Sequence, residues 1–126
     1  MMNWAATGAI ALCLAVMLGA FGAHALRGRL DEYSMGVYEK AVFYHFIHGL
    51  GLVVVSMMPK AGMIGDSGAA AVCALLLAGI VIFSGSLYLL AASGVRALGA
   101  ITPVGGLSFI AAWGLLAYCL LAKRAL

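Results

Sequence analysis

Charged residues are confined to short segments of this chain, and four long stretches between them hold no Asp, Glu, Lys or Arg. These stretches are residues 1–26, 41–59, 67–95 and 97–122. A helix of roughly 20 apolar residues crosses the hydrocarbon core of a bilayer, which is about 30 Å thick. The pattern therefore predicts an all-α fold, an integral membrane bundle of four transmembrane helices in one domain over residues 1–126. The helices are expected at about 3–26, 31–58, 67–93 and 103–121.

Residues at the ends of the stretches fit helix starts and stops. A helical repeat joins the polar segment before residue 41 to the second stretch, through Leu30, Tyr33, Val37, Ala41, Tyr44 and His48. The second helix is thus expected to begin near Asp31 and to end before Pro59, because Pro disfavours helical backbone in the residue before it. Gly94 fits a C-cap. Thr102 followed by Pro103 fits an N-cap and the first residue of the last helix.

Composition agrees with a chain that lies almost wholly in lipid. The chain is 66% hydrophobic and 9% charged, with a mean hydropathy of +1.15. A water-soluble domain of this size could not bury so much apolar surface. The net charge of +3 comes from basic residues beside the apolar stretches, where they meet headgroups or water. We therefore expect no nucleic-acid partner, and membrane lipids, a second copy of the chain or another membrane protein as partners.

The basic residues do not set the orientation in the membrane. If both termini lie on one side, that side holds three of them, Lys60, Lys123 and Arg124. The other side then holds four, Arg27, Arg29, Lys40 and Arg96. The positive-inside rule cannot separate three from four.

Small residues recur every four positions in the first helix, at Thr7, Ala11, Ala15, Gly19 and Ala23. Small side chains let helix backbones approach closely in lipid. This stripe is predicted to be the packing face of the first helix, and Gly19→Leu is expected to weaken the bundle. Three further glycines are candidate packing positions, Gly85, Gly105 and Gly106.

Six polar side chains are predicted to face the bundle interior, because lipid offers them no partners. They are His24, Tyr44, His48, Ser84, Ser86 and Tyr88. His45 and His48 are three residues apart and are expected to share one side of the second helix. The interpretation that we favour is hydrogen bonding between helices.

A metal, haem or catalytic site is the competing interpretation of these groups. At 1.5 Å per residue, His48 lies roughly 12 Å deeper than Lys40, whereas His24 lies only about 4–5 Å inside Arg27. A pair of histidine ligands would therefore be steeply offset, and no HxxxH motif is present. A catalytic serine would need a base, and no Asp or Glu lies at comparable depth. We predict no catalytic residue, no metal and no cofactor.

Four motifs in order resemble one known family across the whole chain. They are Gly19-Ala20-Phe21-Gly22-Ala23-His24, the trio Ala41, Tyr44 and His48, Phe83-Ser84-Gly85-Ser86-Leu87-Tyr88, and Ile101-Thr102-Pro103-Val104-Gly105-Gly106. Together they resemble the YgdD/YwdK-like family of small membrane proteins, a family of unknown function with mitochondrial relatives in animals. The family pattern carries over to His24, Tyr44, His48, Ser84, Gly85, Tyr88, Thr102, Pro103, Gly105 and Gly106. His45 and Val37 depart from it.

The resemblance implies four transmembrane helices in a bacterial inner membrane, with both termini in the cytoplasm and no established activity. We expect a non-enzymatic structural or accessory component. One alternative is a small oligomeric transporter or channel that uses the membrane-embedded His, Tyr and Ser side chains. A second alternative is a quinone- or haem-binding subunit of a redox complex.

Overall fold

The structure, a computed structural model, describes residues 1–124 and consists of helices joined by short connections. The first helix, α1 (Trp4–Phe21), runs on through a π-helical turn at Gly22–Leu26. α2 spans Glu32–Met57. The third long helix combines α3 (Asp66–Gly79), a π-helical segment (Ile80–Ser84) and α4 (Gly85–Ser93). A short 3₁₀ helix, Arg96–Ala100, leads into α5 (Thr102–Arg124).

The all-α fold predicted from the charge-free stretches is confirmed. Four helical segments of the described chain are long and apolar enough to span a membrane: Trp4–Leu26, Glu32–Met57, Asp66–Ser93 and Arg96–Lys123. Each lies close to the predicted range. The 3₁₀ helix and the two π-helical segments were not predicted, because they change the hydrogen-bonding step without changing the hydrophobic pattern.

Local capping explains where the helices begin and end. The Asn3 side chain accepts a hydrogen bond from the Ala6 N–H (3.1 Å), and that of Asp31 accepts one from the Ser34 N–H (2.7 Å). The Ser34 bond, helped by the charge of Arg96, holds the pKa of Asp31 below its usual value. Gly94 ends α4 with a left-handed φ of 71°, as its C-cap assignment requires.

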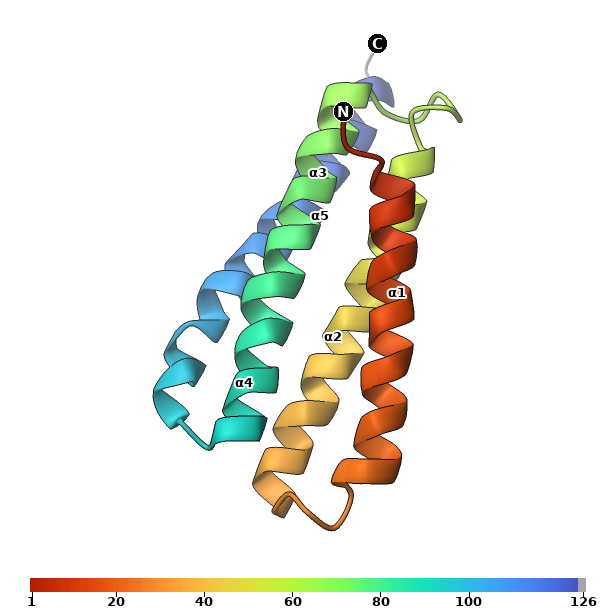
Figure 1. Ribbon diagram of the computed structural model, residues 1–126. Helices are drawn as coiled ribbons and strands as arrows, with labels where there is room; N and C mark the ends of the chain where they lie inside the picture. The colour runs from red at the N-terminus through yellow and green to blue at the C-terminus, as the bar shows by residue number, and fades with distance from the viewer. Residues whose placement is uncertain (125–126) are drawn as a thin grey trace.

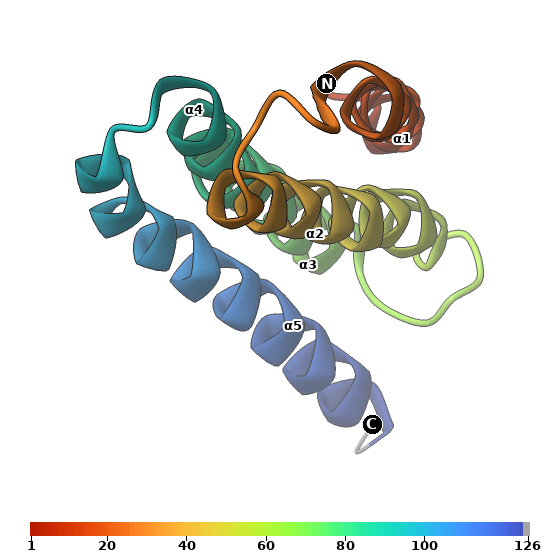
Figure 2. The ribbon, with the colours of Figure 1, turned by 90° about the horizontal axis from the view of Figure 1, so that it is seen from below.

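α2 is the central helix of the bundle. Seen from below, α1 lies on one side of α2 and α5 on the other (Figure 2). α1 packs against α2, whereas α5 packs against α3 and the π-helical segment. Both chain ends lie at one end of the bundle, and the α1–α2 and α4–α5 connections lie at the opposite end (Figure 1).

The packing face of α1 differs from the predicted stripe. Gly8, Ala11, Ala15 and Gly22 are buried against α2, whereas Ala23 is exposed. A step of four residues turns about 40° beyond a full turn, so a stripe from Thr7 to Ala23 drifts about 160° around the helix. The buried set follows a seven-residue repeat, which drifts only about 20° per repeat and stays against a straight partner.

Glycines permit the closest helix contacts, although not at every predicted position. A Cβ at Gly8 would lie 2.7 Å from Val53 Cγ2, and one at Gly105 would collide with the backbone of Phe83. At Gly106 a Cβ would meet the Phe83 ring at an ordinary 3.8 Å, and at Gly85 it would meet nothing within 4 Å. Gly85 is therefore not a packing contact, contrary to the prediction.

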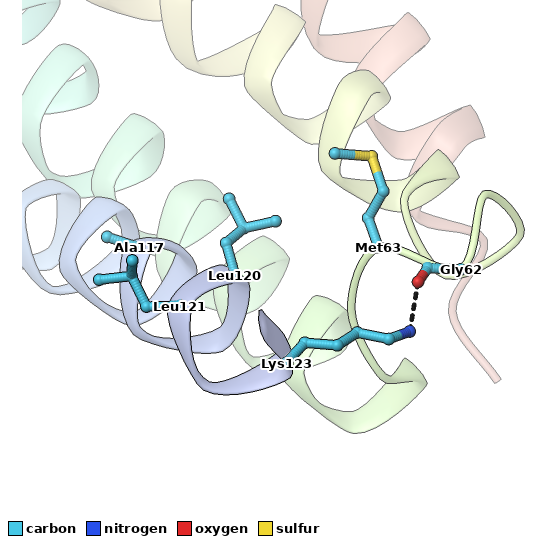
Figure 3. Close-up of a pocket in the computed structure, with 6 residues that line it drawn as sticks. All are labelled: Gly62, Met63, Ala117, Leu120, Leu121 and Lys123. Atoms are coloured by element: carbon cyan, nitrogen blue, oxygen red, sulfur yellow. Dashed lines mark hydrogen bonds between the residues drawn. The ribbon is translucent and has the colours of Figure 1, made fainter. Parts of the chain in front are cut away.

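The apolar core lies where α2, α3 and α5 meet. Its most deeply buried side chains, all at most 1% exposed, include Leu52, Val55, Val72, Leu76 and Ala112. At the end of the bundle that holds the chain termini, Lys123 of α5 donates a hydrogen bond to the Gly62 carbonyl in the α2–α3 loop (Figure 3). This bond ties the last turn of α5 to the loop beside Met63.

Candidate functional site

Five of the six predicted interior polar residues lie inside the bundle. His48, Ser84 and Ser86 are buried, and Tyr44 and Tyr88 are half-buried. They come from α2, the π-helical segment and α4. The prediction is wrong for His24, which is exposed in the π-helical turn after α1. Within that turn Gly22 packs against Tyr38 of α2, and His24, two residues on, points away from α2 toward water or headgroups.

His45 faces the side of α2 that carries α1 and α4. Its Nδ1 lies 2.9 Å from the Tyr88 hydroxyl, and the two rings meet edge to face with centroids 6.0 Å apart. The Tyr88 ring also contacts Tyr38 edge to face at 5.4 Å. His45 and Tyr88 form the polar part of a hollow of about 380 Å³, otherwise lined by apolar residues of α1, α3 and the π-helical segment and by Thr7 and Gly85.

His48 lies about 60° around α2 from His45 and faces α5. Its ring stacks on the Phe109 ring, with the centroids 3.5 Å apart and an interplanar angle of 13°. The centroid of the Trp113 ring lies 5.8 Å from that of His48. His48 Nδ1 lies 2.7 Å from the Tyr44 carbonyl oxygen. A carbonyl can only accept, so Nδ1 carries the proton and Nε2 is left as the acceptor.

The spacing predicted that the two histidines share one side of α2, and that prediction is wrong. Three residues turn a helix by about 300°, which leaves neighbours about 60° apart around the axis. On a helix with partners on both sides, that angle is enough to place His45 with Tyr88 and His48 with Phe109.

Three serines join other helices. Ser84 Oγ donates to the Ala41 carbonyl of α2 (2.8 Å), and Ser108 Oγ donates to the Leu75 carbonyl of α3 (2.7 Å). The Ser86 and Thr102 hydroxyls lie 2.6 Å apart and join α4 to α5. Each hydrogen bond joins two helical segments, so these hydroxyls link neighbouring helices.

Thr102 is the first residue of α5 and not its N-cap, contrary to the prediction. α5 begins at Thr102 itself, so Pro103 is its second residue. The hydroxyl bonds to Ser86 instead of closing the first turn. The 3₁₀ helix before α5 accounts for the shift, because the Val104 N–H already bonds to the Ile101 carbonyl at 3.0 Å.

Several residues of the site were not singled out from the sequence. Tyr38 donates to the Leu18 carbonyl (2.5 Å) and so fastens α1 to α2. Phe109 and Trp113 supply the aromatic faces around His48. His45 departs from the family pattern, so the resemblance does not point to it. A count of polar and aromatic side chains within the apolar stretches would have found His45, Phe109 and Trp113, whereas Tyr38 lies before the second stretch and bonds to a backbone carbonyl.

The interior is satisfied in its hydrogen bonding. Within residues 1–124, every fully buried side-chain nitrogen or oxygen has a hydrogen-bond partner. The same part of the chain holds no group of three or more His, Cys, Asp or Glu that could bind a metal ion. The polar and aromatic side chains of the interior thus form hydrogen bonds and ring stacks between helices.

Comparison with known proteins agrees with the motif resemblance. A family model described as "Protein of unknown function (DUF423)" matches residues 18–106. The chain is 49% identical over 106 residues to the UPF0382 membrane protein SH2409 of Staphylococcus haemolyticus, covering 84% of each chain. It is also 49% identical over 107 residues to the UPF0382 membrane protein YwdK of Bacillus subtilis, covering 84% of this chain and 85% of that one. No solved structure matches. The chain therefore belongs to the DUF423, or UPF0382, family of membrane proteins, for which no activity is known.

Proposed function

We propose that this protein is a non-enzymatic structural or accessory component of the bacterial inner (plasma) membrane. Its four apolar helices support placement in a membrane, and its relatives in Staphylococcus and Bacillus support a bacterial cell membrane. In this proposal the bundle is a rigid scaffold, and its outward-facing surface contacts other membrane proteins.

The use of the interior polar groups carries this proposal. Tyr38 fastens α1 to α2, Ser84 fastens the π-helical segment to α2, and Ser108 fastens α5 to α3. The His45–Tyr88 and Ser86–Thr102 pairs add two more such links. A group engaged in this way is held in one geometry, which suits a scaffold better than a site that must release and rebind a substrate.

Reconstitution tests the proposal against transport. The purified protein is placed in liposomes that contain a pH-sensitive dye, and an imposed proton or potassium gradient is followed over time. We expect the same decay as in protein-free liposomes. Flux that rises with protein content and disappears in a folded Tyr88→Phe variant would support the transporter instead.

A second experiment asks which surface makes contacts in the cell membrane. A photo-crosslinking side chain replaces Tyr118, which is 69% exposed on α5, and in a second variant replaces the buried Leu76. The accessory role predicts a discrete crosslinked protein band from position 118 and none from position 76. Crosslinks to lipid alone from several exposed positions would argue against a protein-contacting component.

The hollow beside His45 supports the quinone-binding subunit as a second candidate. Its volume of about 380 Å³, its apolar lining and its His–Tyr pair match the usual form of a small-molecule site. Saturable quenching of Trp4 fluorescence by a short-chain quinone, lost in Gly85→Leu, would favour this function. Gly85 is suited to the test because it lines the hollow and a Cβ there meets no atom within 4 Å.

A further inference from the structure

A second apolar hollow runs between α2 and α5, on the side of α2 away from α1. Its first part, about 500 Å³, is lined by Tyr33 and Lys40 among others. Its second part, about 660 Å³, reaches Phe109 and Gly114 and the other residues around His48. Tyr44 and Phe83 line both parts, so the two form one α2–α5 groove.

The groove has the length of one lipid chain. On α5 its lining runs from Thr102 to Gly114, about 18 Å at 1.5 Å per residue. Half of the hydrocarbon core is about 15 Å thick. Ile110 and Trp113, at 69% and 39% exposed, leave the groove open to the surrounding lipid. A chain that enters at one membrane face would reach the middle of the bilayer inside the groove.

Two cations flank the half of the groove nearer the membrane face. Lys40 lines it and is exposed. The guanidinium of Arg96 lies 4.7 Å from the ring centroid of Tyr33, another lining residue. The start of α2 and the α4–α5 connection, which carries Arg96, lie at the same end of the bundle (Figure 1). Arg96 is therefore placed at the headgroup layer of this face, and Lys40, about 10 Å further along α2 than Tyr33, reaches that layer by extending its long side chain toward it.

Nearby carboxylates leave Lys40 available. Asp31 caps α2 through the Ser34 N–H and lies within the electrostatic reach of Arg96. Glu39 lines a different hollow, on the α1 side of α2. In the part of the chain that the structure describes, the groove lining includes Lys40 and no carboxylate.

We propose that the α2–α5 groove binds one anionic phospholipid, with its phosphate between Lys40 and Arg96 and one acyl chain along Tyr44, Phe83 and Phe109. Basic pockets between transmembrane helices are the usual sites for anionic headgroups. A helix of a second copy would cover the groove but leave the Lys40 ammonium without a counter-charge. A free phosphate would leave the apolar length of the groove unused. This inference goes beyond the accessory role and does not depend on it.

Native mass spectrometry of the full chain in a neutral detergent tests the site. Phosphatidylglycerol and phosphatidylcholine with identical acyl chains are added at equal concentration, and the retained lipid is counted. We expect one retained phosphatidylglycerol per chain and clearly weaker retention of phosphatidylcholine. The double variant Lys40→Gln/Arg96→Gln should weaken phosphatidylglycerol binding about 30-fold, because each basic residue near an anionic headgroup contributes roughly fivefold.

Matched variants separate the charge from the groove. Lys60→Gln removes the same charge at the other end of α2 and should change binding less than twofold. Gly114→Leu should abolish retention without lowering the lipid-free melting temperature, because a Cβ at Gly114 meets nothing within 4 Å. Ala111→Leu, on an exposed position of α5 outside the groove, should retain the lipid.

The inference is overturned by any of three results. These are equal retention of the two lipids by the wild type, an equal loss in Lys60→Gln, or unchanged retention in Gly114→Leu. Complete competition by soluble glycerol phosphate would identify a free-anion site and overturn it as well. If the double variant does not fold, salt replaces it: raising the ionic strength of the wild type must weaken phosphatidylglycerol retention and spare phosphatidylcholine. Equal salt sensitivity of the two lipids would contradict the site.

Discussion

The contact between α5 and the π-helical segment is the place where one added methyl group should matter most. Gly105 is buried against Phe83, and a Cβ there would lie 2.7 Å from the Phe83 Cα and closer still to its backbone nitrogen. Backbone atoms cannot rotate away as the end of a side chain can. Gly105→Ala therefore forces the two helices apart. Gly106→Ala, one residue along, is the matched control, because its Cβ would meet the Phe83 ring at 3.8 Å.

The magnitude follows from the geometry. The distance of 2.7 Å falls about 0.7 Å short of the 3.4 Å at which ordinary van der Waals contact begins. Overpacking of this kind costs about 1–3 kcal/mol. Replacing Gly by Ala in a helix returns roughly 1 kcal/mol through its higher propensity. That gain is common to both variants, so Gly105→Ala should be about 1–3 kcal/mol less stable than Gly106→Ala.

Reversible unfolding in mixed micelles, titrated with SDS and followed by helical circular dichroism, measures this difference. Both variants are compared with the wild type at one protein and lipid concentration. The reasoning fails if Gly105→Ala is as stable as Gly106→Ala, or if Gly106→Ala loses more. The first outcome would mean that α5 slides past Phe83 at little cost, and the second that the tight contact lies one residue further along.

Three other perturbations follow from the same structure. Gly8→Ala should lower the free energy of unfolding more than Gly19→Ala, because the added Cβ would lie 2.7 Å from Val53 at position 8 but 3.4 Å from Val42 at position 19. The same titration measures both variants. Equal losses would contradict the seven-residue packing face. Ser84→Ala should cost about 0.6–1.7 kcal/mol, since it removes the buried bond to the Ala41 carbonyl, and an unchanged midpoint would show that this bond is not a fastener. The pKa of Asp31 is lowered in the folded protein, so its contribution to the free energy of unfolding is complete above the unfolded pKa of about 3.9 and is lost as pH falls through the folded value. Asp31→Asn should remove this acid sensitivity from the unfolding curves. An unaltered pH profile in that variant would contradict the prediction.

The hydrophobic pattern was sufficient to predict the helices but not their packing faces. Charges mark the ends of transmembrane helices strongly, because each charge is costly in lipid. The face that a helix turns to its neighbour depends on weaker differences between small side chains. In α1, Thr7 and Gly8 are both small, and only the course of α2 decides that Gly8 is the buried one.

Bonds to backbone carbonyls were equally beyond the sequence. The interior serines were predicted to hydrogen bond between helices, and Ser84 does so with the Ala41 carbonyl. Nothing in the side-chain pattern names that acceptor, because every residue carries a carbonyl. His24 shows the opposite failure. It occupies a family motif, yet it is exposed, because within its π-helical turn Gly22 is the residue that packs against α2.

The two histidines of α2 show why a central helix needs its neighbours before its polar residues can be interpreted. Spacing alone predicted that His45 and His48 share one side of α2. The bundle instead places α1 and α4 on one side of α2 and α5 on the other, so the angle of about 60° between the two side chains separates them into different interfaces. His45 is engaged by Tyr88 and His48 by Phe109 and the Tyr44 carbonyl. The two histidines therefore belong to two separate helix contacts, and a substitution at one should leave the hydrogen bond of the other intact.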